Sequence, residues 1–350
     1  MVKKLIIKYF ISDITSIIIG YYTNGNLGEC NDLAALPKNY LIYEFTKCAS
    51  NGNDRLLTAV MRLKSQHLCR GMVNIHTWVD AAKGGNIDVI KWLHNNIKNN
   101  TYIERAMIEA ASEGHLEAVK WFHYNRKEKY TTGAMDWAAT GGHLDTVKWL
   151  HYNRTEGCTT NAMDKAARYG HLDVVKWLHY NRNEGCTTDA MDEAVRFRKV
   201  DVVNWLHVNR TEGCSSLAMI WAAAGGNLKL LQWLYDNYDK GRTYEVMDSA
   251  AKYGRLEVVK WLHYNRTEGC TKYAMNEAAG NGHLDTVKWL HYNRTEGCTK
   301  YAMDNALSQG HIKTAKWLYD NRQEGYSLYY MDVAICKHRG VDRKMFQKMK

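Results

Sequence analysis

Histidine is the residue in this chain best able to hold a metal ion or move a proton, and its spacing is regular. Twelve of the fifteen histidines fall on two series with a step near 28 residues: His115, His143, His171, His283 and His311, and His94, His123, His151, His179, His207, His263 and His291. His171 and His179 are eight residues apart, about 12 Å along a helix, too far to share one zinc ion. The chain also has no Cys-x-x-Cys pair. We therefore expect structural histidines, no metal site, and a response to acid.

Cysteine is the second residue type that could do chemistry. Five of the nine occupy the same place in successive copies of a repeated segment: Cys158, Cys186, Cys214, Cys270 and Cys298. Equivalent points of stacked helical repeats lie roughly 8–10 Å apart, whereas a disulfide needs Cα atoms within about 7 Å. We expect free thiols and therefore a reducing, intracellular compartment such as the cytoplasm.

Sequence motifs for catalysis are missing. The chain contains neither a Gly-x-x-x-x-Gly-Lys nucleotide loop nor a Gly-x-Ser-x-Gly nucleophile elbow. Its acids and histidines recur once per repeat instead of converging at one place. We expect no enzymatic activity and no cofactor.

These residues belong to a unit that recurs nine times. A Trp followed by Leu or Phe marks each copy: Trp92, Trp121, Trp149, Trp177, Trp205, Trp233, Trp261, Trp289 and Trp317. The period is 28 residues after a first step of 29, and Met stands fourteen residues before the Trp in eight copies. A fixed period of this size indicates a solenoid.

The first half of each unit is predicted to be a short helix. It begins after a Ser or Thr whose hydroxyl can cap the first turn. Met163, Ala166 and Ala167 share one face, and the alanines allow neighbouring helices to approach closely. The helix is expected to end at Gly170 in the left-handed conformation. The fifth copy has Arg198 in place of this glycine.

The second half is predicted to be a helix from about Leu172 to Tyr180, with Leu172, Val175 and Leu178 on its buried face. Residues 181–186 then connect to the next copy. Neither helix can bury its apolar face alone, so stacked neighbours must form one continuous core. The expected fold is an all-α solenoid of helix-turn-helix repeats.

Residues 166–178, Ala-Ala-x-x-Gly-His-Leu-Asp-Val-Val-Lys-Trp-Leu, resemble the centre of the ankyrin repeat, and in particular the shortened, Trp-rich repeats of amoebae and their giant viruses. The resemblance covers residues 74–326. It implies an ankyrin-like solenoid that binds another protein through its concave face, in the host cytoplasm if the chain is viral. The usual Thr-Pro-Leu-His opening reads Asn161-Ala162-Met163-Asp164, and the period is about five residues short. We therefore expect the projecting β-hairpin finger to be stunted.

The ends depart from the repeat. We predict an N-terminal segment at 1–40, a degenerate capping repeat at 41–73, and a partial C-terminal capping repeat with a basic tail at 327–350. Residues 1–22 are rich in Ile, but charges interrupt the apolar run, so a membrane span or signal peptide is disfavoured. Leu36-Pro37 with Leu41-Ile42 faintly resembles the start of an F-box, which leaves an adaptor role open.

Net charge raises nucleic acid as an alternative partner. The chain carries +10 overall. Residues 1–73 and 327–350 carry +4 each, and the nine repeats between them carry only +2. A basic groove along the repeats is therefore not predicted. Binding of nucleic acid or an anionic surface through the basic ends remains the second hypothesis.

The candidate binding residues come from comparing the copies with one another. Four first-helix positions, 16, 12, 9 and 8 residues before the Trp, vary while the others are nearly constant; we call them the variable first-helix positions. The residues there that we expect to contact a partner are Trp137, Tyr169, Phe197, Trp221, Tyr253, Lys165, Arg168, Glu193, Arg196 and Tyr273. Drift at exposed positions is the alternative, but aromatic residues at exposed positions often anchor interfaces. The sequence thus predicts a monomeric, non-catalytic scaffold or adaptor.

Overall fold

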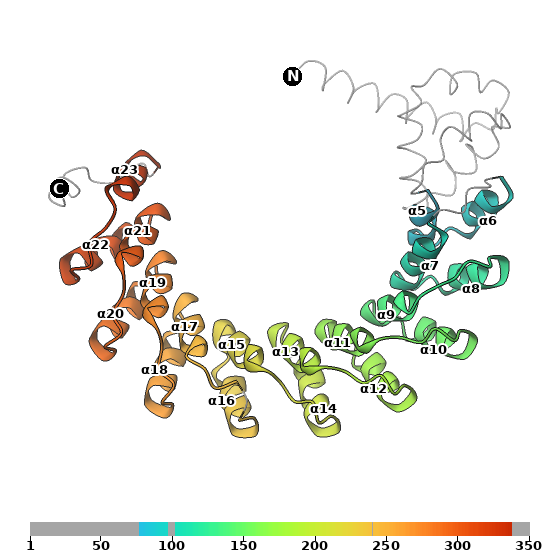
Figure 1. The fold of residues 1–350 in the computed structure, drawn as a ribbon, viewed down its shortest axis with the longest axis horizontal. Helices are drawn as coiled ribbons and strands as arrows, with labels where there is room; N and C mark the ends of the chain where they lie inside the picture. The colour runs from blue at the N-terminus through green and yellow to red at the C-terminus, as the bar shows by residue number, and fades with distance from the viewer. Residues whose placement is uncertain (1–76, 97–101, 240, 338–350) are drawn as a thin grey trace, which may run out of the picture. The chain divides into compact units, whose positions relative to one another are not determined.

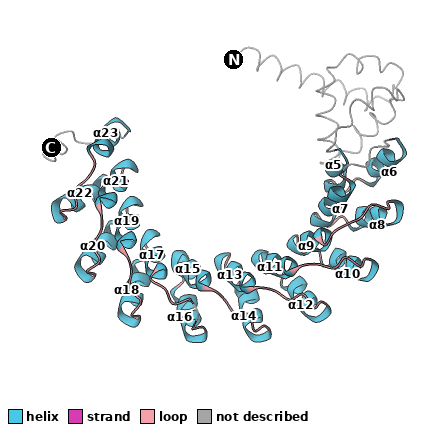
Figure 2. Cartoon of the chain, in the orientation of Figure 1, coloured by secondary structure: helices cyan, strands magenta, loops and turns pink. Residues whose placement is uncertain are grey.

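The computed structural model describes residues 77–96, 102–239 and 241–337, which form nineteen helices and no strand (Figures 1 and 2). The helices are α5 (Thr77–Lys83), α6 (Ile87–Asn96), α7 (Ile103–Ser112), α8 (Leu116–Asn125), α9 (Gly133–Thr140), α10 (Leu144–Asn153), α11 (Thr160–Tyr169), α12 (Leu172–Asn181), α13 (Thr188–Arg196), α14 (Val200–Asn209), α15 (Ser216–Gly225), α16 (Leu228–Asn237), α17 (Glu245–Lys252), α18 (Leu256–Asn265), α19 (Lys272–Gly280), α20 (Leu284–Asn293), α21 (Lys300–Ser308), α22 (Ile312–Asn321) and α23 (Leu328–Lys337). The predicted N-terminal segment, capping repeat and most of the basic tail lie outside these residues.

The chain divides at Ala162 into two compact units, each of which we describe by itself. In both units the odd-numbered helices pack against one another along the chain, and the even-numbered helices form a second row beside them. Within the second unit, the odd-numbered row lies on the inner side of the curve (Figure 1). The predicted all-α, ankyrin-like solenoid is confirmed, and the connections in the described residues carry no β-hairpin (Figure 2).

The first helix of each repeat buries the predicted small face. In α11, Ala166 and Ala167 are fully buried and Met163 nearly so, while Lys165 is half-buried. The predicted caps also form: the Thr187 hydroxyl accepts a hydrogen bond from the amide of Asp189 at 3.1 Å, and this satisfies a free amide of the first turn. The alanines therefore leave room for the neighbouring first helices to pack closely.

The second helix differs in detail from the prediction. In α12, Val174, Val175 and Leu178 are buried, whereas Leu172 at the helix start is only half-buried. The buried stripe of α12 is therefore shifted away from the helix start, with Val174 in place of Leu172. The helix extends to Asn181, whose side-chain amide donates to the carbonyl of Trp177 at 2.8 Å. The equivalent Asn closes the second helix in other copies.

The glycine between the two helices is required twice. Gly254 has a φ of +66°, which L side chains rarely adopt. The imidazole of His283 from the next repeat lies over it, with Nδ1 only 2.5 Å from where a Cβ would stand. Arg198 takes the same conformation with a φ of +58°, and its guanidinium donates to the carbonyl of Gly225 at 3.0 Å. This hydrogen bond offsets part of the left-handed strain.

Candidate partner-binding face

In several repeats a buried acid links one first helix to the next. In α11, the carboxylate of Asp164 accepts from the amide and the hydroxyl of Thr187, both at 2.9 Å. Thr187 in turn caps α13. Burial raises the pKa of Asp164, and the bonds from Thr187 oppose that shift. Asp192 makes the same contact with Ser215, the cap of α15. We call this contact the capping link; it fixes α11, α13 and α15 relative to one another.

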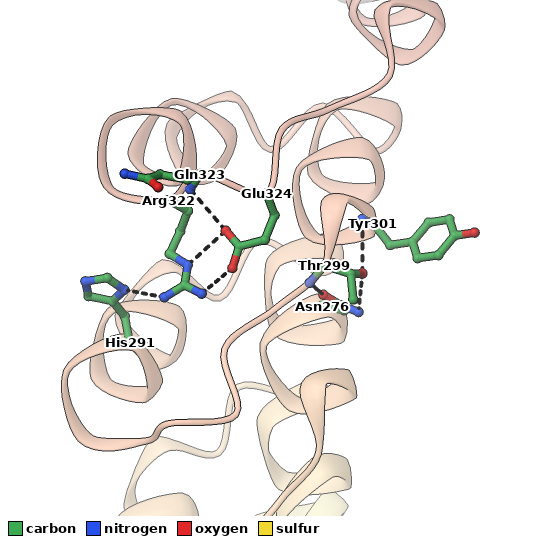
Figure 3. A network of polar contacts seen from close by, with 7 residues as sticks. All are labelled: Asn276, His291, Thr299, Tyr301, Arg322, Gln323 and Glu324. Carbon is green, nitrogen blue, oxygen red and sulfur yellow. Dashed lines mark hydrogen bonds and ion pairs between the residues drawn. The ribbon is translucent and has the colours of Figure 1, made fainter.

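Asparagine can replace the acid in this link. Asn276 accepts from the Thr299 amide at 2.9 Å and donates to its hydroxyl at 3.0 Å, while that hydroxyl accepts from the amide of Tyr301 (Figure 3). The side-chain oxygen and one further polar atom are therefore sufficient. The negative charge is not required.

The histidines after the Trp serve a second link between repeats. Arg210 donates to His179 Nδ1 at 3.2 Å and is held by the carboxylate of Glu212. The imidazole of His179 also packs edge-on against Trp205, with ring centroids 5.1 Å apart. We call this His–Arg–Glu contact the arginine link. Figure 3 shows it at His291, Arg322 and Glu324. These histidines hold the repeats together, and the described residues contain no cluster of three side chains that could bind a metal ion.

The histidine pKa values follow from burial and from the facing arginines. Burial, then the positive charge of Arg154, lowers the pKa of His123 below 6.5. Burial likewise lowers the pKa of His283, with Arg255 and His311 adding to the shift. Neutral imidazole is therefore the form that the fold prefers at these two positions.

The variable first-helix positions bring five of the predicted residues into one row. Arg168 places its guanidinium carbon 5.4 Å from the centre of the Tyr169 ring and 4.7 Å from that of Phe197. Arg196 places its own 5.4 Å from the centre of Phe197 and 4.2 Å from that of Trp221. Rings and guanidinium groups thus alternate across the ends of α11 and α13 and onto α15. We call these five residues the guanidinium–aromatic row.

One carboxylate serves both cations of this row. Glu193 lies with Oε2 3.5 Å from Arg168 and Oε1 3.5 Å from Arg196. These contacts are long for charge-assisted hydrogen bonds. The buried Nε of Arg168 and the Oε2 of Glu193 have no hydrogen-bond partner in the described residues. Together with Glu193, the row therefore carries two positive charges and one negative charge, and its guanidinium donors are not all paired.

The other predicted contact residues stand outside the row. Tyr253 at the end of α17 is 44% exposed, and Tyr273 on α19 is 68% exposed. In the described residues neither ring has a guanidinium group over it. The sixth repeat has Ala224 at the position that Arg168 and Arg196 occupy in theirs, so no guanidinium group lies between Trp221 and Tyr253. Lys165 lies half-buried on α11. Trp137 belongs to the first unit, where it is 47% exposed on α9.

Sequence comparison missed a second set of exposed rings. The tyrosines three residues after the Trp, among them Tyr180, Tyr264 and Tyr292, are about 70% exposed on the even-numbered helices. Each packs edge-on against the histidine before it, at 4.8–4.9 Å. This position is Tyr in five of the nine copies and lies on the second helix, so a comparison restricted to the variable first-helix positions could not find it. The sequence does contain a signal for Arg168 and Arg196, because an arginine directly precedes an aromatic residue at the same position of two consecutive repeats.

The five aligned cysteines are free and buried. Burial raises the pKa of Cys186, Cys214 and Cys270 to about 12, so these thiols stay protonated at neutral pH. A protonated, buried thiol is a poor nucleophile. Among the described residues, every helix is too short or too polar to span a membrane.

Comparison with known proteins agrees with this architecture. The family model described as "Ankyrin repeats (many copies)" matches residues 79–123, 135–179, 163–207, 247–291 and 278–319, which together span more than half of the chain. No curated protein gives a significant match. The match falls on the helix pairs whose packing is described above. The chain therefore belongs to the ankyrin repeat family.

Proposed function

We propose that this chain is a non-catalytic scaffold or adaptor that binds another protein through the variable first-helix positions. Ankyrin repeats generally mediate protein–protein interaction. The observation that carries the choice of face is the guanidinium–aromatic row. Its rings are partly exposed and differ from one repeat to the next, so a partner could recognise these repeats in one register only.

The packing of the row favours binding on physical grounds. Trp, Tyr and Arg dominate the free energy of protein interfaces, and a preorganised side chain loses little conformational entropy when a partner docks. Phe197 contacts two guanidinium groups, and 39% of it remains exposed. The side chains of the row are therefore already ordered, and their exposed apolar area can bind a partner at little cost in conformational entropy.

The finer features of this proposal extend beyond the row. We include Trp137, Tyr253, Lys165 and Tyr273 as further contact residues on the inner side of each unit. The 28-residue, Trp-containing repeat supports placing the chain among the shortened repeats of amoebae and giant viruses. The free thiols support a reducing, cytoplasmic setting. We also propose a monomer, whose inner face is open to a partner.

The test is a selection of random 16-residue peptides, displayed on phage, against the full chain. Synthetic copies of the selected peptides are then titrated with wild type, with Trp221→Ala and with Tyr264→Ala. If Trp221 is an anchor, its loss should weaken binding by about 2 kcal/mol or more, while circular dichroism and the melting curve stay nearly unchanged. Tyr264→Ala removes an equally accessible ring from the other helix row and should have little effect.

Two outcomes would reject this face. Peptides that bind Trp221→Ala and Phe197→Ala as tightly as wild type would show that the variable positions are drift. Peptides that no longer bind Tyr264→Ala would place the binding site on the even-numbered helices. Trp233 serves as a reference for fold damage: it packs edge-on against His207 at 4.8 Å, so its replacement should lower the melting temperature itself.

A further inference from the structure

We propose that the segment bound by the guanidinium–aromatic row is acidic, an extended peptide whose Asp or Glu carboxylates meet Arg168 and Arg196. This inference rests on the proposed function and adds the chemistry of the partner. It has three physical grounds: unused donors, ring faces already occupied by cations, and the local charge.

The donors of the row are not saturated. A guanidinium carries five N–H groups in a planar fork that fits a carboxylate. Arg168 and Arg196 share a single carboxylate, that of Glu193, at 3.5 Å each. The side chain of Arg196 is also 40% exposed. The arginines of the arginine links are different, since Arg210 is held by both oxygens of Glu212 and also donates to His179. The row therefore keeps guanidinium donors that an incoming anion can reach, above all those of the partly exposed Arg196.

The ring faces of the row that contact Arg168 and Arg196 are not free to bind a cation. A positively charged group binds an aromatic ring over its face. The guanidinium groups of Arg168 and Arg196 already lie over the faces of Tyr169, Phe197 and Trp221. A Lys or Arg of a partner would meet these two cations first and be repelled. The arrangement selects against basic segments and for acidic ones.

The surface around the row also carries an excess of positive charge. In the fourth and fifth repeats the variable first-helix positions carry Lys165, Arg168 and Arg196 against Asp189 and Glu193. Arg198, which is exposed beside Phe197, adds another positive charge. At the equivalent position of the seventh repeat, Lys252 is paired with Glu277 at 3.0 Å. The positive excess is therefore local to the row.

The spacing suits an extended chain. In a β-strand, side chains at i and i+2 point the same way and stand roughly 7 Å apart. Arg168 and Arg196 both reach the one carboxylate of Glu193, so their guanidinium groups lie within a comparable distance. Alternate residues of an extended peptide could therefore place one carboxylate on each arginine. The residue between them would point away from the row.

The test is to determine the amino-acid sequences of the same selected 16-residue peptides. Peptides that need Trp221 should be enriched in Asp and Glu at i and i+2. Synthetic versions with these acids changed to Asn and Gln should bind wild type at least tenfold more weakly. Arg196→Gln should weaken the acidic peptide about tenfold, whereas Lys252→Gln makes the same charge change at the same repeat position and should change affinity less than twofold.

The outcomes separate this inference from the proposed function. Trp221-dependent peptides without acidic enrichment, or with unchanged affinity after Asn and Gln substitution, would overturn the acidic partner and leave the binding face standing. Equal losses for Arg196→Gln and Lys252→Gln would also overturn it, because net charge and not the row would then matter. The neutral peptides are measured on wild-type protein, so the result does not depend on whether Arg196→Gln folds.

Discussion

The contact from α13 to α15 and the contact from α15 to α17 join equivalent helices, but the structure builds them differently. In the first, Asp192 accepts from the amide and hydroxyl of Ser215, and α15 is capped. In the second, Ile220 stands where the acid would be, and the buried hydroxyl of Thr243 has no partner in the described residues. The guanidinium–aromatic row ends at the same point, at Trp221.

The difference shows what the capping link does. After Ile220, helix α17 begins at Glu245, one residue later in its repeat than α15, and its cap makes no side-chain hydrogen bond. The first unit is similar: Ile108 stands in place of the acid and α9 begins late at Gly133, although the Thr131 hydroxyl still accepts from the Gly133 amide at 3.4 Å. The capping link therefore favours the earlier helix start. Without it, α15 and α17 are held together by packing and by a long hydrogen bond from the Ser249 hydroxyl to the Ile220 carbonyl at 3.5 Å.

The second helices of the same repeats show a parallel loss. Tyr235 replaces the histidine that would accept from Arg266, and the guanidinium turns over the tyrosine ring at 4.2 Å. Arg266 Nε and Glu268 Oε2 are then left without hydrogen-bond partners in the described residues. The sixth repeat thus lacks both of these links, and it joins its successor by burial, by the cation–π contact and by a hydrogen bond from Arg255 Nε to the carbonyl of Ala224 at 2.8 Å. The fourth and fifth repeats keep the polar links that position the row.

The largest effect is expected from removing the acid of an intact link. Asp192→Ala leaves the amide and hydroxyl of Ser215 without their acceptor, and should cost roughly 3 kcal/mol in the free energy of unfolding from urea melts. Asp192→Asn is the matched control, because Asn276 makes the same link. Equal losses for both variants would mean that charge, and not the hydrogen bonds, stabilises the link.

A smaller loss of stability is expected from enlarging the buried alanines through which neighbouring first helices pack. Ala166→Leu should overpack α11 against its neighbours and cost roughly 1–3 kcal/mol, and Ala222→Leu should cost about as much on α15 because both alanines are buried. Lys165→Leu, at a half-buried position, should cost little. A large loss for Lys165→Leu with none for Ala166→Leu would reverse the assignment of faces.

The weak contact can also be repaired. Ile220→Asp should supply the missing acceptor to Thr243 and raise the free energy of unfolding by about 1 kcal/mol, because it satisfies a buried hydroxyl. Hydrogen exchange at the first turn of α17 should slow in the same variant. Unchanged stability and exchange would show that the late helix start has another cause.

The smallest effect is expected from pH. The pKa of His123 is lowered in the folded state, first by burial and then by Arg154. The unfolded chain therefore binds more protons below about pH 6.5, so stability should be complete above that pH and fall as pH drops toward the folded pKa. The urea midpoint should be lower at about pH 5.5 than at pH 7. His123→Gln keeps an acceptor for Arg154, so it should flatten this dependence; an unchanged slope would exclude His123.

The repeat period, the helix pairs and the alanine face could be predicted from the sequence because each rests on local spacing repeated nine times. Leu172, expected on the same face as Val175 and Leu178, is only half-buried, and the burial of Val174 was not predicted. The capping link and the arginine link were not foreseen. They join residues 23 and 31 positions apart, and only the stacked helices bring such pairs together.

The candidate site was only partly readable. Variation between copies drew attention to Tyr169, Phe197 and Trp221, but their connection through Arg168 and Arg196 depends on side-chain geometry. The separation of Tyr253 from the row follows from Ala224, a single residue without a cation. The 28-residue period does not reveal the effect of a single substitution at this position.

Site-specific photocrosslinking to a selected peptide tests the central claim most directly. A benzophenone amino acid replaces Phe197 in one variant and Tyr180 in another, both aromatic and exposed but on different helix rows. Binding to the guanidinium–aromatic row predicts a crosslink from position 197, competed by unlabelled peptide, and none from position 180. A crosslink from position 180 with none from position 197 would contradict the account.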